Sequence, residues 1–151
     1  MESRFLNDLS PGDRFVCGGV TLTEAEIIGF ALHYDPQPFH LDAGVAADSI
    51  YGGLIASGFQ VVSLCFRMFI QQGVLSESSM GSPGIDELRW LAPVRPGDTI
   101  RTEVEVVELR PSRSKPDRGI ARLAYRALNQ RDEVVSSFFV NHLLRTRSEA
   151  E

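Results

Sequence analysis

The chain has 151 residues, and its 15 Lys and Arg against 20 Asp and Glu give a net charge of −5. With 43% hydrophobic residues it can bury the core of one domain, which excludes a fully disordered chain. The acidic balance argues against a general nucleic-acid binder, because such a protein needs a basic face for phosphates. We therefore expect a single domain over residues 1–151 that has no nucleic-acid partner.

Three features of the sequence indicate in which cellular compartment we expect the protein. Met1–Asp13 has no basic stretch followed by an apolar one, so we expect no secretory signal. Cys17 and Cys65 show neither metal-ligand spacing nor a disulfide framework, which favours a reducing, cytoplasmic setting. Cys65 lies in an apolar run, where a packed thiol is expected rather than a nucleophile. Leu54–Ile70 is interrupted by polar residues and is shorter than the roughly 20 apolar residues of a membrane span, so we predict a buried helix.

The first half of the chain has helical patterns. Thr21 or Thr23, followed by acidic residues, caps a predicted helix that Pro36 ends, because the residue before a proline is pushed out of the helical region. Asp35–His40 is then expected to be a stiff, non-helical loop. A short helix is predicted over Asp42–Asp48.

A longer helix follows the Gly52-Gly53 break. Ser57 is a good N-cap, and the predicted helix runs from there to about Gln72, with Gly73 as its C-cap.

The second half of the chain has strand patterns. Apolar and polar residues alternate over Leu88–Val94, Ile100–Val106 and Ala121–Ala127. Val134–Leu144 is apolar on both faces, which predicts a central strand, and a further short strand is possible at Arg14–Val20. Most connections are short turns, which favours an antiparallel sheet. Wrapping that sheet around the buried helix hides both apolar surfaces and predicts an α+β domain.

Asp35 and His40 are the first candidates for chemistry. They lie five residues apart on the segment stiffened by two prolines, and a carboxylate and an imidazole held together can polarise one water. The alternative is that Asp35 caps a backbone and His40 makes a local hydrogen bond. Of the other histidines, His142 is expected to be structural, and His33 to lie near the site or to face solvent.

The predicted helix start at Ser57 is the second candidate. If Ser57 caps the helix, the N–H of Gly58 has no partner within it and is free to stabilise a developing negative oxygen, such as that of a thioester enolate. The alternative is a plain capped helix with a glycine for tight packing. We expect no metal site, because one histidine and one aspartate make a poor ligand set.

These motifs resemble the MaoC-like acyl dehydratase family, which includes the (R)-specific enoyl-CoA hydratases. The resemblance is carried by Asp35-Pro36-Gln37-Pro38-Phe39-His40 and by Ile55-Ala56-Ser57-Gly58, and it extends to Trp90–Thr99. It implies the hot-dog fold, in which an antiparallel sheet wraps a long helix, in one domain over residues 1–151. It also implies that Asp35 and His40 activate water and that the Gly58 N–H holds the thioester oxygen.

Two positions depart from the family pattern. Gln37 stands where the motif has asparagine, and Ser57 stands where many members have histidine. The resemblance places both at the substrate, and it matches Ser63 to a serine that some members place beside the acid.

Arg110–Arg118 is a third candidate. It carries four positive charges and one negative, and Arg113, Lys115 and Arg118 are the residues we expect to hold the phosphates of coenzyme A. The alternative is a solvated hairpin loop.

The resulting prediction is a hydratase or dehydratase that interconverts a 2-enoyl thioester and a 3-hydroxyacyl thioester, with coenzyme A as the expected carrier. It needs no cofactor, because the thioester makes the β-carbon electrophilic, and by resemblance it is a homodimer or higher homo-oligomer away from membranes. A hot-dog thioesterase often carries an acid on the central helix, and Gly58–Gln72 contains none. A non-catalytic subunit that binds acyl thioesters has no need of Asp35 and His40 together.

Overall fold

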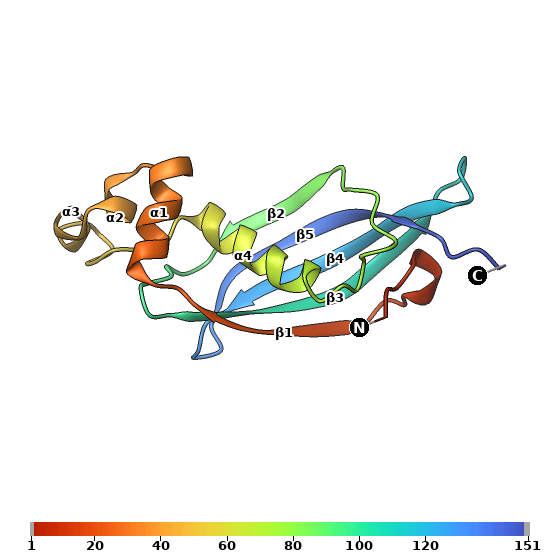
Figure 1. The fold of residues 1–151 in the computed structure, drawn as a ribbon, viewed down its shortest axis with the longest axis horizontal. Coiled ribbons are helices and arrows are strands. Elements are labelled where there is room, and N and C mark those ends of the chain that lie inside the picture. The colour runs from red at the N-terminus through yellow and green to blue at the C-terminus, as the bar shows by residue number, and fades with distance from the viewer. Residues whose placement is uncertain (1, 150–151) are drawn as a thin grey trace.

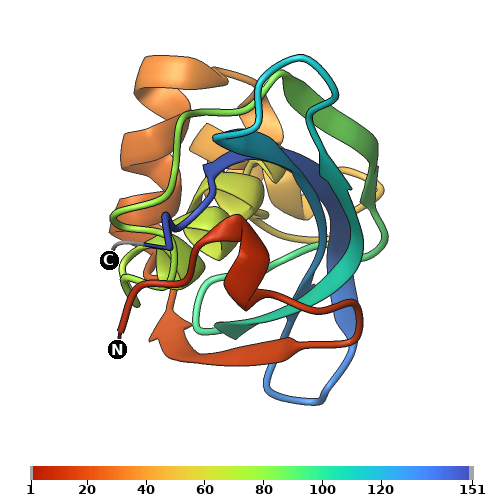
Figure 2. The same ribbon diagram turned by 90° about the vertical axis from the view of Figure 1, so that its right-hand side faces the viewer.

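The computed structural model describes residues 2–149, which form one antiparallel sheet, four α-helices and a short 3-10 helix. The helical segments are η1 (Leu6–Asp8), α1 (Glu24–Tyr34), α2 (Pro38–Leu41), α3 (Ala43–Ala47) and α4 (Gly58–Ile70). The strands are β1 (Arg14–Thr21), β2 (Gly84–Trp90), β3 (Thr99–Pro111), β4 (Arg118–Leu128) and β5 (Val134–Arg145). Their order across the sheet is β1-β3-β4-β5-β2. The sheet curves around α4 (Figure 2), which confirms the predicted α+β, hot-dog architecture.

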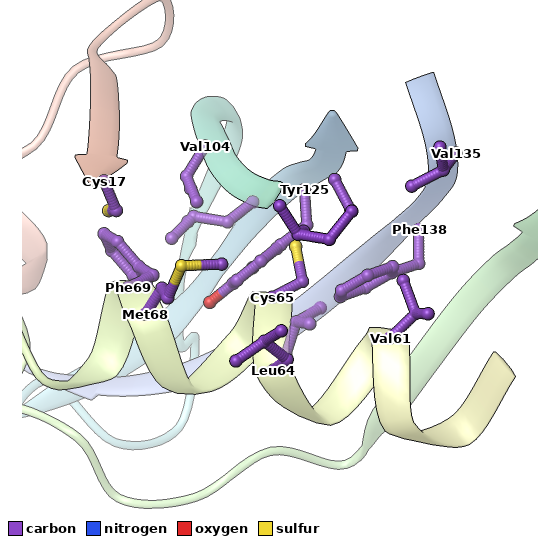
Figure 3. Packing of buried hydrophobic residues seen from close by; sticks show 14 of the residues in the cluster. Cys17, Val61, Leu64, Cys65, Met68, Phe69, Val104, Tyr125, Val135 and Phe138 are labelled. Carbon is purple, nitrogen blue, oxygen red and sulfur yellow. The ribbon is translucent and has the colours of Figure 1, made fainter. Parts of the chain in front are cut away.

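Helix α4 packs one face against the concave side of the sheet. Its buried residues recur at helical spacing, and they meet buried side chains of four strands (Figure 3). The labelled contacts include Val61, Leu64, Cys65, Met68 and Phe69 from the helix, and Cys17, Val104, Tyr125, Val135 and Phe138 from the strands. Both cysteines are free and buried, which confirms the packed thiol predicted for Cys65, and burial raises the pKa of the Cys65 thiol to about 12. In the part of the chain that is described, no helix is long and apolar enough to cross a membrane.

The order of the strands leaves β1 and β2 at the edges. Strand β5 lies between β4 and β2, so the prediction of an interior position for this strand is confirmed. The three small helices α1, α2 and α3 gather at one end of the sheet, beside the N-terminus of α4 (Figure 1). Thr23, rather than Thr21, caps α1 in a capping box with Glu26.

The prediction of a strand over Leu88–Val94 is wrong in its bounds. Strand β2 begins at Gly84 and ends at Trp90, and the N–H groups of Leu91 and Ala92 both donate to the Val135 carbonyl instead of continuing the ladder. Pro93 has no N–H to donate, so the pairing stops before it. Residues 92–94 consequently form a loop that runs beside the start of α4, where Ala56 N–H donates to the Val94 carbonyl.

The prediction that Asp35–His40 is wholly non-helical is also wrong. Residues Pro38–Leu41 form the single-turn helix α2. Pro38 occupies the first turn, where the missing N–H costs nothing and the fixed φ suits a helix. The turn places the His40 side chain inside the protein, where its ring is buried.

A buried Tyr125–His142 hydrogen bond leads to a prediction on acid stability. Tyr125 Oη lies 2.8 Å from His142 Nε2, and burial lowers the pKa of His142 from 6.5 to about 4. Between these two pKa values His142 is protonated in the unfolded chain and neutral in the folded chain. The free energy of unfolding therefore falls as the pH drops through this window, by ~3 kcal/mol in total. We expect His142→Gln to remove this part of the pH dependence in urea unfolding at pH 7 and pH 4. Equal pH dependence in both proteins would contradict the assignment.

Candidate active site

Asp35 and His40 meet at the junction of α1, α2 and α4. Asp35 is the C-cap of α1, which Pro36 ends as predicted, and His40 lies on α2. His40 Nε2 lies 3.2 Å from Asp35 Oδ2, and the two side chains are only 5% and 13% exposed. The structure thus brings together the pair that the sequence predicts, in a site largely shielded from solvent.

The Asp35 carboxylate accepts hydrogen bonds on both oxygens. Gln37 Nε2 donates to Oδ1 at 2.7 Å, and Ser57 Oγ donates to Oδ2 at 2.7 Å. Burial by itself raises the pKa of Asp35, but the hydrogen bonds from Ser57 and Gln37, together with His40, outweigh it and hold this pKa below its ordinary value. Asp35 is therefore a carboxylate at neutral pH, and it stays ionised well into the acid range.

A backbone carbonyl determines which ring nitrogen of His40 carries the proton. Its Nδ1 lies 2.7 Å from the Ile55 carbonyl oxygen, which can only accept, so Nδ1 carries a proton. Nε2 is then the ring nitrogen that exchanges a proton, and it faces Asp35 Oδ2. The geometry leaves one imidazole nitrogen and one carboxylate oxygen to act together on a proton.

The N-terminus of α4 has an open amide. Ser57 caps this helix as predicted by accepting from the Phe59 N–H, and the Gly58 N–H makes no hydrogen bond within the described chain. The Trp90 indole lies against Gly58: a Cβ built on this glycine would be 2.2 Å from Trp90 Cε2. Only a glycine fits beside this indole, and the Phe59 ring meets the indole edge-to-face with centroids 5.3 Å apart.

These groups face a single pocket with a volume of about 440 Å³. Asp35, Gln37 and His40 supply its polar side chains, and the Gly58 backbone lies in its wall. The rest of the lining is apolar: Phe39, Tyr51, Ile55, Ala56, Phe59, Val61, Trp90, Leu91, Ala92, Pro93, Val94 and Val135. A small apolar group fits such a pocket, with a few polar groups converging on one point of it.

Several residues predicted to bind substrate lie elsewhere. Ser57 is fully buried beneath the pocket and binds Asp35. Ser63 is exposed on α4, is absent from the pocket lining, and donates to the Phe59 carbonyl of its own helix at 2.8 Å. His33 is exposed, and its Nδ1 lies 2.9 Å from the Gly29 carbonyl of its own helix. His142 is buried in the core, as predicted.

The basic segment lies away from the pocket within one chain. Arg118 begins β4 and forms an ion pair at 2.9 Å with Asp117, the one acidic residue of the segment. Arg113 and Lys115 are exposed on the β3–β4 connection and make no ion pair among the described residues. This connection lies at the opposite end of the sheet from α1 and α2 (Figure 1).

Sequence reasoning missed the role of three pocket residues. Trp90, Tyr51 and Val135 come from β2, the segment before α4, and β5, and only the folded chain brings them together. The single tryptophan was a usable signal for Trp90, since it stands beside the Pro93-containing loop in the segment that resembles the family.

The fold and the pocket define a hot-dog protein with a buried aspartate–histidine pair beside an open helix amide. The sequence matches the MaoC like domain family over residues 9–124. This match spans most of the chain, so the protein belongs to that family.

Solved structures and curated relatives agree with this assignment. The MaoC-like dehydratase from Rhodospirillum rubrum is 39% identical, with a TM-score of 0.90 over 97% of this chain and 99% of that one. The R-hydratase PhaJ1 from Pseudomonas aeruginosa is 25% identical, with a TM-score of 0.76 over 95% and 86% of the two chains. A 3-hydroxybutyryl-CoA dehydratase from Methylorubrum extorquens is 33% identical over 107 residues, which are 68% of this chain and 61% of that protein.

Proposed function

We propose that the protein adds water to a 2-enoyl thioester to give a 3-hydroxyacyl thioester, and catalyses the reverse reaction, with coenzyme A as the carrier. The observation that carries the proposal is the Asp35–His40 contact inside an apolar pocket that also contains the open Gly58 amide. Two relatives, one named as an R-hydratase and the other as a 3-hydroxybutyryl-CoA dehydratase, support the reaction class and the carrier.

Each step of the reaction has a group in the pocket to perform it. In the hydration direction, Asp35 accepts a proton from water as the water oxygen bonds to C3 of the enoyl group. Negative charge then moves to the thioester oxygen, where the Gly58 N–H donates to it. His40 orients the water through Nε2, and the Asp35–His40 pair returns a proton to C2. No further group is consumed, so atoms and charge balance over the cycle.

Two other functions fit the pocket less well. Hot-dog thioesterases often use an acid on the central helix, and α4 carries no Asp or Glu. A subunit that only binds acyl thioesters has no use for a buried carboxylate that faces an imidazole and accepts from two donors, because burying such a group costs free energy. The buried contact between Asp35 and His40 therefore favours a catalytic function over a binding function.

The proposal includes a homodimer. Strand β2 is an edge of the sheet, and Ile85, Trp90 and Leu91 are large apolar side chains exposed there. A structure from Mycobacterium tuberculosis that is described as a double hotdog fold is 25% identical, and this chain covers 46% of it, which is consistent with two such units in one assembly. We expect sedimentation equilibrium to give twice the mass of the chain, and a monomer at micromolar concentration would contradict this part.

A dimer also offers a role for the basic connection. An antiparallel pairing of two β2 strands would bring the Gly84 end of one copy to the Trp90 end of the other. Gly84 pairs with Asn141 and Arg118 with Arg145, so the connection lies about four residues, or ~13 Å, beyond Gly84. Arg113 and Lys115 of one copy are thereby carried towards the pocket of the other, where they suit the phosphates of coenzyme A.

The test is turnover of a short 2-enoyl-CoA, followed by the loss of the conjugated thioester absorbance. We expect the wild-type protein to remove this absorbance without releasing free thiol. As a matched pair, His40→Ala is expected to lose about 10²- to 10⁴-fold in kcat, whereas His33→Ala keeps the wild-type rate. Thiol release without hydration would show a thioesterase, and tight binding without either reaction would show a binding subunit.

A further inference from the structure

Ser57 forms two hydrogen bonds that link different parts of the molecule. Its hydroxyl donates to Asp35 Oδ2 at 2.7 Å, and Ser57 Oγ also accepts from the Phe59 N–H at 3.3 Å. The residue is 0% exposed, so water does not compete for either bond. A hydroxyl that accepts from an amide is also polarised towards donating, which strengthens its bond to the carboxylate.

The hydrogen bond of Ser57 connects the two parts of the site to which we assign different roles in the reaction. Asp35 follows α1 and is separated from Ser57 by 22 residues in the sequence. Gly58, the next residue after Ser57, is the first residue of α4 and carries the open amide. The Ser57 hydroxyl is thus the bond that ties the water-activating carboxylate to the helix end that faces the thioester oxygen.

We propose that Ser57 is a positioning residue. Its hydroxyl fixes the position of the Asp35 carboxylate relative to the Gly58 N–H, so that the water held by Asp35 is aligned with the thioester held by Gly58. This inference rests on the proposed function. It gives a physical role to one of the departures from the family pattern: a serine here retains a helix cap and supplies a short donor to the carboxylate. The serine acts through Asp35, and the closed surroundings leave it no contact with the pocket.

The same geometry sets the direction of a pH effect. The groups that contact the Asp35 carboxylate are His40 from α2, Ser57 at the start of α4, and Gln37 from the α1–α2 connection; His40 is the one that titrates. Removing the Ser57 hydroxyl takes away a donor that favours the ionised form, so the pKa of Asp35 rises. At a given acidic pH a smaller fraction of Asp35 is then ionised, and the acid limb of the rate profile moves to higher pH.

The experiment compares Ser57→Ala with the wild-type protein in two measurements. The first follows the Asp35 carboxyl carbon by NMR titration of the free protein, where we expect the midpoint to rise in the variant. The second is steady-state hydration, where we expect kcat to fall about 10- to 100-fold with little change in KM, because the water and not the substrate is misplaced. Ser57→Thr, which restores a hydroxyl, is expected to recover both values.

Control variants separate this role from a loss of structure. Ser57→Gly also removes the hydroxyl but costs less than alanine at an N-cap, so it replaces Ser57→Ala if the latter unfolds. Ser76→Ala removes an exposed hydroxyl that donates to the Gly73 carbonyl at 3.0 Å, and should change neither measurement. An Asp35 titration unchanged by loss of the Ser57 hydroxyl would overturn the proposal. The NMR arm needs no turnover, so it decides the role of Ser57 even if the hydratase function fails.

Discussion

Asp35→Asn is expected to lower turnover of a 2-enoyl thioester by about 10²- to 10⁴-fold. The substitution keeps the size of the side chain and a carbonyl oxygen that can accept from Ser57 or Gln37. It removes the carboxylate, which is the base that accepts a proton from water. Nε2 of His40 also loses its anionic partner at 3.2 Å. The rate constant from the absorbance assay measures the effect, with substrate binding followed separately.

Asp42→Asn is the matched control for this substitution. Asp42 is exposed, caps α3 by accepting from the Gly44 and Val45 N–H groups, and has no contact with the pocket. Asparagine caps a helix about as well as aspartate, so fold and turnover should be retained. Equal activity in Asp35→Asn and Asp42→Asn would remove Asp35 from the mechanism.

Gly58→Ala keeps the backbone N–H but is expected to lower activity by about 10²-fold while leaving the fold intact, because the added methyl group displaces the pocket wall beside this amide. Its Cβ would lie 2.2 Å from Trp90 Cε2 and 2.5 Å from Nε1, so the indole has to leave the helix end. Alanine is the better helix former, so α4 itself is not weakened. Trp90 is the only tryptophan in the chain, and a shift in its fluorescence would report the movement directly.

Gly29→Ala is the matched control here. Gly29 lies within α1, and a Cβ built on it meets no atom within 4 Å. This variant is expected to keep both the wild-type fluorescence and the wild-type rate. Full activity in Gly58→Ala would contradict the claim that the site depends on the close approach of the Trp90 indole to this glycine.

Local signals made the Asp35–His40 pair predictable. Pro36 ends α1 immediately after Asp35, and Pro38 begins the turn that carries His40, so the short segment between them allows few arrangements. The cap at Ser57 and the period-two strands are likewise local, and the apolar face of α4 has to be covered by the sheet. The fold therefore followed from patterns within each segment.

The contacts that complete the site are not local. Trp90 reaches Gly58 only because β2 ends beside the start of α4, and the strand ends there because Leu91 and Ala92 pair with the Val135 carbonyl. The alternation of residues 88–94 does not mark that end, and Pro93, which cannot donate to the ladder, is the one local signal for it. Ser57 was predicted as a cap and a substrate contact, but its bond to Asp35 depends on how α1 packs against α4.

Charge alone was a poor guide to position. The basic segment stood out by composition, yet it is the β3–β4 connection, which lies at the far end of the sheet from the pocket in the same chain. Part of its charge is also offset by Asp117. A second copy of the chain is needed before this segment can serve the site.

The destination of the water oxygen separates hydration of C3 from hydrolysis of the thioester. A short 2-enoyl-CoA is incubated with the protein in ¹⁸O-labelled water, and the products are separated and analysed by mass spectrometry. We expect label on the 3-hydroxyl oxygen of an intact 3-hydroxyacyl-CoA, and loss of this incorporation in Asp35→Asn. Label in a free carboxylate, with release of coenzyme A, would contradict it, because the water would then have attacked the thioester carbon instead of C3.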